Sequence, residues 1–352
     1  MHERLIADFT AGKKAALARA ISIVENHRPG FEELLANWHP RLGHARRIGI
    51  TGPPGAGKST LTTGLTKAYR AQGLTVGIIA VDPTSPFTGG ALLGDRIRME
   101  EVALDPGVYI RSLATRGSLG GLSAATRETS DVLDAFGIDR ILIETVGVGQ
   151  SELDVARTAD SSLVVLVPES GDSIQTLKAG LMEIADIFTV NKADRPGADR
   201  LRNEIEVMLG MRSGATMRNV PAHHGVDLSK NNILRQVRAA AQSVDTTHWT
   251  PPVLRTVAVK DEGIDELVAA LDRHFQYLED SGALRARRRA RLRERVVEVV
   301  EDKTRRRLWG DAATNQWLEE RLPELETGSA TPFAIADDLL ARSVDLLTRT
   351  SG

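Results

Sequence analysis

The chain has 352 residues, of which 41% are hydrophobic and 26% are charged, and its formal net charge is −2. This balance is typical of a soluble globular protein, and it gives no global electrostatic attraction to nucleic acid or to an anionic membrane. The absence of cysteine excludes disulfides, thiolate zinc sites, iron–sulfur ligation and cysteine nucleophiles.

The N-terminal segment predicts helices. Apolar side chains recur at helical spacing through residues 1–27, which precede Pro29 and Gly30, and FEELLANW predicts a short helix that ends before Pro40. Charges are scattered through this segment and it has no unbroken apolar core. We therefore expect no signal peptide, no transmembrane span and a cytoplasmic protein. We assign residues 1–44 to an N-terminal helical extension.

Short apolar, β-branched runs alternate with helical patterns from Arg46 onward. Near-continuous apolar runs predict the buried strands of a parallel sheet, with crossover helices between them. We therefore expect an α/β domain at 45–275, with a doubly wound, mostly parallel P-loop sheet flanked by helices. The predicted strands are RRIGIT (46–51), TVGIIAV (75–81), VYIRSL (108–113), RILIET (140–145), SSLVVLV (161–167), DIFTVN (186–191) and VLRTVAV (253–259).

The segment 211–252 interrupts this alternation. It is rich in polar and loop-forming residues, and we interpret it as an excursion on the domain. Its adjacent histidines, His223 and His224, raise the question of a metal site. No cysteine and no third ligand at a recognisable spacing accompany them, which favours a solvated loop pair.

The C-terminal part predicts only helices. The stretch 265–309 predicts one or two long helices, and WLEERLPELE and PFAIADDLLARSVDLL predict further ones, the last with Thr331 as N-cap and Pro332 in its first turn. The basic run at 285–295 raises the alternative of nucleic-acid binding. Acidic residues and an apolar stripe follow it, which indicates an amphipathic helix suited to packing against a partner subunit. The stripe comprises Leu284, Leu292, Val296, Val299 and Val300. We assign 276–352 to a C-terminal helical dimerisation arm.

The segment GPPGAGKST follows the first predicted strand and precedes a helix, with the spacing Gly-x-x-x-x-Gly-Lys-Ser. This context is typical of a phosphate-binding P-loop, because glycines let backbone N–H groups turn toward phosphates and the helix N-terminus adds positive potential. We expect Lys58 to reach the β- and γ-phosphates and the Ser59 hydroxyl to bind magnesium. The expected nucleotide contacts are Gly52, Pro53, Pro54, Gly55, Ala56, Gly57, Lys58, Ser59 and Thr60.

The tetrapeptide NKAD (191–194) comes just after the apolar run DIFTV, at the C-terminal end of another predicted strand. Ligands bind at this edge of the sheet in open α/β folds. The Asp194 carboxylate can accept hydrogen bonds from guanine N1–H and from the 2-amino group, whereas adenine presents an acceptor at N1. We expect Asn191 to bridge the base and the P-loop, and the Lys192 stem to lie over the base. This pattern predicts specificity for GTP and GDP.

Three acidic residues are candidates for the magnesium side of the site. Asp82 and Glu144 lie at the ends of predicted strands, and Asp95 acts either near the metal or as the N-cap of a helix. The backbone N–H of Gly147 is expected to sense the γ-phosphate. Val148 occupies the place where small regulatory GTPases usually carry a water-orienting glutamine, so we expect slow intrinsic GTP hydrolysis.

Taken together, these motifs resemble the MeaB/MMAA-type GTPases, which are associated with methylmalonyl-CoA mutase and are also labelled ArgK. The matching blocks, in chain order, are GPPGAGKST, VDPTSPFTGGALLGDRIRM, TRGSLGGLS, ETVGVGQSE, GDSIQTLKAGLMEIADIFTVNKAD and PPVLRTVAV. The resemblance implies a homodimer with a helical C-terminal arm that binds a cobalamin-dependent acyl-CoA mutase. It also implies that GTP gates cofactor loading and protects the mutase, and that the mutase accelerates GTP hydrolysis.

The resemblance also implies roles for individual residues. The implied catalytic set is Lys58, Asp95, Glu144 and Gly147, and the implied metal set is Ser59, Asp82, Asp95 and Glu144. The segment 168–180 falls where the family has a third switch, with Asp172, Gln175 and Lys178 as candidate contacts to the mutase. Two departures stand out. The excursion at 211–235 is longer than expected, and Val257-Ala258 replaces a common Ser-Ala that closes over the base. The backbone of Val257 and Ala258 can still supply that contact, so we expect both residues to bind the nucleotide.

Three other classes of protein share parts of this pattern. A nickel-type metallochaperone GTPase has the same sheet and P-loop, but such proteins usually carry Cys-rich or His-rich metal motifs. An ATPase or kinase linked to arginine or ornithine transport fits the older family label, and NKAD argues against it. A targeting GTPase of signal-recognition type would need a methionine-rich helical domain, which six methionines in the whole chain do not supply.

Overall fold

The structure, a computed structural model, describes residues 2–83, 99–115, 121–145, 151–168, 180–212 and 248–343. The chain divides into two compact units, Met1–Arg285 and Ala286–Gly352. The three-part division at residues 44 and 275 stays a prediction. Within the described residues, no helix combines the length and the apolar composition needed to cross a membrane.

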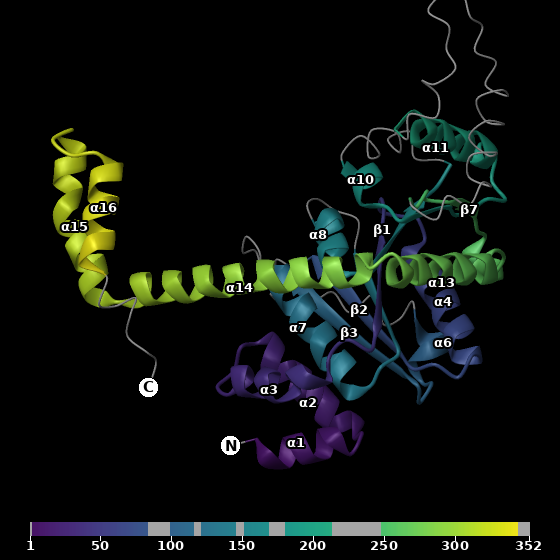
Figure 1. The fold of residues 1–352 in the computed structure, drawn as a ribbon, viewed down its shortest axis with the longest axis horizontal. Coiled ribbons are helices and arrows are strands. Elements are labelled where there is room, and N and C mark those ends of the chain that lie inside the picture. Colours follow the sequence, from purple (N-terminus) through teal and green to yellow (C-terminus); the bar gives the residue numbers. More distant parts are fainter. Residues whose placement is uncertain are drawn as a thin grey trace, which may run out of the picture. The chain divides into compact units, whose positions relative to one another are not determined.

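The first unit is built on a seven-stranded sheet in which every described pair of neighbouring strands is parallel (Figure 1). The strand order is β3-β2-β4-β1-β5-β6-β7. The strands are β1 (Arg46–Thr51), β2 (Val76–Pro83), β3 (Val108–Thr115), β4 (Arg140–Thr145), β5 (Ser161–Leu166), β6 (Ile187–Val190) and β7 (Val253–Arg255). The chain moves outward in opposite directions on the two sides of β1, so the predicted doubly wound α/β fold is confirmed and its switch point lies at the end of β1.

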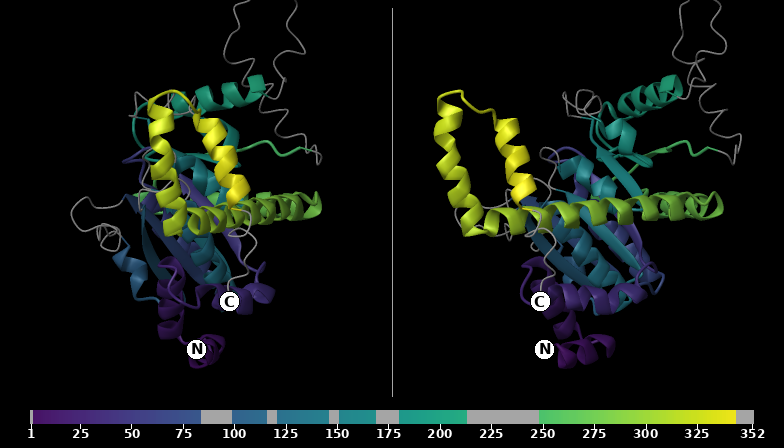
Figure 2. Two further views of the ribbon diagram at one scale, coloured as in Figure 1. Left: turned by 90° about the vertical axis from the view of Figure 1, so that its left-hand side faces the viewer. Right: turned by 60° about the vertical axis from the view of Figure 1, so that its left-hand side comes forward.

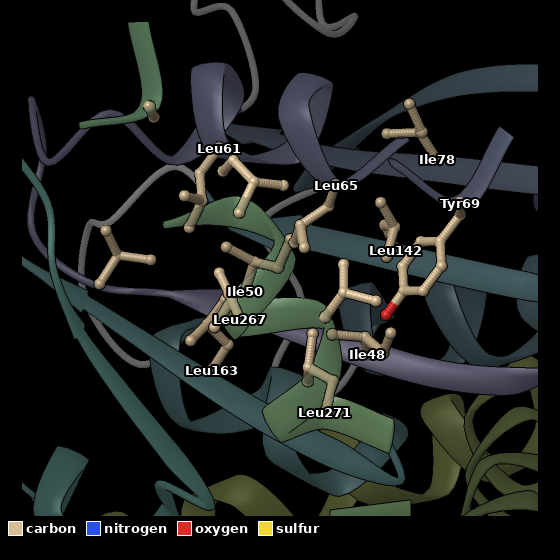
Figure 3. Packing of buried hydrophobic residues seen from close by; sticks show 14 of the residues in the cluster. Ile48, Ile50, Leu61, Leu65, Tyr69, Ile78, Leu142, Leu163, Leu267 and Leu271 are labelled. Carbon is tan, nitrogen blue, oxygen red and sulfur yellow. The ribbon is translucent and has the colours of Figure 1, made fainter. Parts of the chain in front are cut away.

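Helices cover both faces of this sheet. On one face, α4 (Lys58–Ala71) and α13 (Ile264–Asp280) bury Leu61, Leu65 and Leu267 against Ile48 and Ile50 of β1 (Figure 3). The opposite face carries α1 (Glu3–Thr10), α2 (Lys14–Glu25), α3 (Phe31–Trp38), α7 (Gly121–Phe136) and α8 (Ser151–Thr158). At the far edge of the sheet, α11 (Ala198–Arg212) packs beside β6 and β7. The short elements are η1 (His39–Arg41), α6 (Glu100–Ala103), α10 (Met182–Ile184) and η4 (Ala258–Lys260).

Two sequence predictions differ from the structure in their boundaries. The helical spacing through residue 27 forms two helices, because Gly12 adopts a φ of +76° and turns the chain between them. The run at 253–259 is a strand only to Arg255. The Ala258 N–H donates instead to the Asn191 side chain at 3.1 Å, so this segment leaves the sheet and forms part of the site described below.

The C-terminal helices are α14 (Ala283–Gly310), α15 (Ala312–Glu326) and α16 (Pro332–Arg342). Figure 2 shows α15 and α16 as a hairpin within the second unit. Thr331 is an N-cap as predicted, since its hydroxyl accepts a hydrogen bond from the Ala334 N–H. In α14, the apolar stripe is exposed on Leu292, Val296, Val299 and Val300.

Candidate nucleotide-binding site

The candidate site lies at the carboxyl ends of the parallel strands. The P-loop joins β1 to α4, Glu144 lies near the end of the neighbouring strand β4, and the NKAD segment follows β6. Because β1 is the switch point of the sheet, these loops flank the place where ligands bind in open α/β folds.

The P-loop takes its shape from three glycines in left-handed conformations, with φ of +137° at Gly52, +73° at Gly55 and +85° at Gly57. Lys58 starts α4 and is buried, and its Nζ donates to the carbonyl oxygens of Gly52 at 2.8 Å and Pro53 at 3.0 Å. These bonds hold the ammonium group over the loop at the positive end of the helix dipole, which is suited to binding phosphate oxygens.

Alanine substitution should distinguish two reasons for glycine in this loop: the left-handed backbone conformation and the lack of space for a Cβ atom. A Cβ at Gly52 would lie 2.1 Å from the backbone oxygen of Val165, whereas a Cβ at Gly55 would meet nothing within 4 Å. We expect Gly55→Ala to lower the free energy of unfolding by about 1–2 kcal/mol, the cost of a left-handed conformation. Gly52→Ala should cost more than about 3 kcal/mol, because strand β5 must also move. Denaturant unfolding without nucleotide measures both, and equal losses would contradict this account.

The Glu144 carboxylate is the acidic group that the structure places beside the P-loop. It is buried, and its Oε1 accepts a hydrogen bond from the Ser59 hydroxyl at 2.6 Å. Its Oε2 lies 3.1 Å from the Thr62 hydroxyl, one turn further along α4. Sequence reasoning did not single out Thr62, although the three-residue spacing from Ser59 places both hydroxyls on the same face of a helix.

Oxygen donors of this kind fit magnesium, which prefers hard oxygen ligands together with phosphates and water. The register pairs Ala80 of β2 with Glu144, so the backbone of Asp82 lies two residues further along the adjacent strand end. Ser59 and Glu144 would therefore hold the ion from the protein side, with Asp82 as a further candidate. Among the described residues, no three His, Cys, Asp or Glu side chains form a metal cluster, and a phosphate-bound magnesium does not require one.

Asn191 joins three loops of the site. It is buried, and its Nδ2 donates to the Ala56 carbonyl of the P-loop at 2.8 Å. Its Oδ1 accepts from the Ala258 N–H at 3.1 Å and from the Thr256 hydroxyl at 3.2 Å. A Cβ on Gly57 would lie 2.5 Å from Asn191 Nδ2, so glycine is needed at position 57 for this bridge.

The expected base-reading residues surround the same amide. Lys192 adopts a φ of +55°, which turns the chain sharply after β6. The Asp194 side chain is about half exposed, and Lys260 of η4 lies 3.8 Å from its carboxylate. Val257 pairs with Glu262 in an isolated bridge that closes the loop around Ala258. An exposed carboxylate next to a closed loop is an arrangement that can accept donors from the edge of a base.

Several predicted residues lie outside the described part of the chain. These are Asp95, Gly147, Val148, Asp172, Gln175, Lys178, His223 and His224. Their expected roles at the γ-phosphate, the metal and the partner surface stay predictions.

Two features together define the class of P-loop GTPases. One is a glycine-rich phosphate loop at the N-terminus of a helix, placed at the switch point of a parallel sheet. The other is an asparagine that links this loop to the NKAD segment expected to bind guanine. The chain belongs to the family of the methylmalonyl Co-A mutase-associated GTPase MeaB, whose family model matches residues 17–313. This match extends from the N-terminal helices into α15, well beyond the phosphate and base motifs.

Relatives and a solved structure agree with this membership. A Pyrococcus abyssi protein assigned as a GTPase is 44% identical over 97% of this chain and 96% of its own length. The GTPase ArgK of Escherichia coli is 33% identical, covering 91% and 90%, and the mouse methylmalonic aciduria type A homolog is 32% identical, covering 96% and 78%. The crystal structure of an LAO/AO transport system kinase superposes with a TM-score of 0.66 at 26% identity, and covers 96% of both chains.

Proposed function

We propose that this GTPase is a chaperone for a cobalamin-dependent acyl-CoA mutase, with methylmalonyl-CoA mutase as the first candidate, and that it gates cofactor loading and protects the mutase. The observation that carries the proposal is the family match over residues 17–313, since the family is named for its association with that mutase. The mouse relative named for methylmalonic aciduria supports the same assignment.

The proposed chemistry is magnesium-dependent hydrolysis of GTP to GDP and phosphate. Lys58 binds phosphate oxygens, Ser59 and Glu144 hold the metal side, and Asp194 binds the base. Magnesium, when bound, neutralises charge on the β- and γ-phosphates. The side chain of Val148 cannot hydrogen-bond to water, so hydrolysis is slow until a partner supplies or repositions the missing group.

The proposed partners are the mutase and a second copy of this chain. The third switch, with Asp172, Gln175 and Lys178, is the proposed contact to the mutase. The exposed apolar stripe of α14 supports a homodimer formed through the C-terminal arm. Apolar side chains that are exposed together on one helix are stabilised when a partner buries them. The proposed location is the cytoplasm.

GTP turnover by the purified chain, with and without a candidate mutase, tests this function. We expect slow turnover alone and stimulation by the cognate mutase. Glu144→Ala should lower both rates, whereas Lys178→Ala should lower the ratio of stimulated to basal rate. Lys13→Ala, which changes an exposed lysine at the start of α2, is the matched control and should leave the ratio unchanged. No stimulation by any acyl-CoA mutase would overturn the proposal.

The similarity to the LAO/AO transport system kinase favours a second candidate, an ATP-dependent kinase linked to amino-acid transport. The NKAD segment argues against it, because Asp194 suits guanine rather than adenine. Transfer of phosphate from ATP to a transport protein would support this second function, and strict preference for GTP would reject it.

A further inference from the structure

Both oxygens of the Glu144 carboxylate contact hydroxyl groups of α4. Oε1 accepts from Ser59 at 2.6 Å, and Oε2 lies 3.1 Å from the Thr62 hydroxyl. Thr62 has no exposed surface, and Glu144 is buried. A carboxyl group rotates easily about its last bond. Two hydroxyls three residues apart on one helix therefore fix the plane of this carboxylate, which a single contact cannot do.

The Thr62 hydroxyl has one proton and two acceptors within reach. One acceptor is the Lys58 carbonyl at 2.9 Å, the usual back-bond of a buried helical threonine, and the other is Glu144 Oε2. An ionised carboxylate is the stronger acceptor of the two. The Thr62 hydroxyl therefore donates its hydrogen bond to Glu144 Oε2, and the Lys58 carbonyl keeps its ordinary helical bond.

Two neighbouring threonines show that this contact is particular to position 62. Thr63 and Thr66 are also buried in α4 and make the same back-bond, to the carbonyls of Ser59 at 3.0 Å and Thr62 at 2.7 Å. Of these three threonines, Thr62 is the one with a described hydrogen bond to the Glu144 carboxylate.

We propose that Thr62 is a positioning residue for magnesium: it holds Glu144 Oε2 so that Oε1 stays on Ser59 and on the metal side of the site. The proposal rests on the proposed placement of magnesium at Ser59 and Glu144. It also gives a physical reason for glutamate at position 144, because the carboxylate of an aspartate ends one methylene short of both hydroxyls.

Release of a fluorescent GDP analogue, measured against free magnesium concentration, tests the proposal without relying on hydrolysis. In Thr62→Val, a near-isosteric change, we expect the magnesium concentration for half-maximal retention to rise on the order of tenfold, as for other partners of metal ligands. Release without magnesium should be unchanged. Thr62→Ser keeps the hydroxyl and should restore the wild-type value, and Thr63→Val and Thr66→Val are the matched controls. An equal shift in the controls would overturn the proposal.

A double-mutant cycle separates positioning from a general effect on α4. In a Glu144→Asp background the shorter carboxylate does not reach Thr62, so adding Thr62→Val should change the magnesium requirement by less than about twofold. The same factor in both backgrounds would overturn the proposal.

Glu144→Gln distinguishes the proposed placement of magnesium from the proposed role of Thr62. If it leaves the magnesium requirement unchanged, the placement of the metal itself is wrong. If Glu144→Gln raises the requirement while Thr62→Val does not, only the role of Thr62 is wrong.

Discussion

Replacing Lys58 by methionine should lower the rate of GTP hydrolysis by about 10²-fold or more, the usual loss when one charge-stabilising donor is removed from an active site. The Lys58 ammonium is held by two P-loop carbonyls at 2.8 and 3.0 Å, so the protein itself fixes its position over the loop. Methionine keeps the length and the apolar stem but removes the charge. Single-turnover hydrolysis, with the proposed mutase partner absent and present, measures the loss of both the basal and the stimulated rate.

Lys67→Met is the matched control on the same helix. Lys67 is partly exposed and pairs with Glu101 and Asp261, and its hydrogen bond with Glu101 raises its pKa. Surface ion pairs contribute about 0–1 kcal/mol, so this variant should unfold almost like the wild type and keep its hydrolysis rate. A comparable loss of activity in Lys67→Met would show that the effect at Lys58 is not specific to the phosphate site.

Asp194→Asn should convert the preferred nucleotide from GTP to XTP. The asparagine oxygen can still accept from guanine N1–H, but its N–H₂ group faces the 2-amino group, so one hydrogen bond is lost and two donors oppose each other. We estimate this cost at about 3 kcal/mol, or a factor of roughly 10² in affinity. Xanthine carries an oxygen where guanine carries the 2-amino group, so the new amide N–H₂ can donate to it. Titration of the variant with both diphosphates measures the exchange of preference.

Asp199→Asn provides the control for the charge change. Asp199 lies at the start of α11, is mostly exposed and pairs with Arg255 at 2.9 Å. The Asp199→Asn substitution removes one negative charge near Asp194 without changing the NKAD segment, so the affinity for GDP should be retained. Equal weakening in both variants would indicate a general electrostatic effect, and failure of XDP to bind Asp194→Asn would contradict the assignment of the base-reading carboxylate.

The fold was predictable because its strands are buried on both faces. The runs around Ile48, Ile143 and Val164 are apolar without alternation, which is typical of the strands of a parallel sheet covered by helices on both sides. The break at Gly12 was missed because the apolar spacing continues through it. The early end of β7 was missed because Val257 and Ala258 are apolar enough for a strand, and a contact with Asn191, distant in sequence, takes them out of the sheet.

The candidate site was predictable where a local motif determines it. The turns at Gly52 and Gly57 follow from the P-loop spacing, because a left-handed backbone favours glycine. The contact between Thr62 and Glu144 was not predictable, because it depends on the distance and rotation between α4 and β4, which no local spacing encodes. Sequence reasoning named Glu144 and gave no account of what holds its second oxygen.

The bridge made by Asn191 has a consequence for the speed of binding. One buried amide holds the phosphate loop, the turn after β6 and the loop at Ala258 together through hydrogen bonds within the protein. A pocket that is pre-organised in this way loses little conformational entropy when the ligand arrives. Base and phosphate can therefore be captured in one encounter.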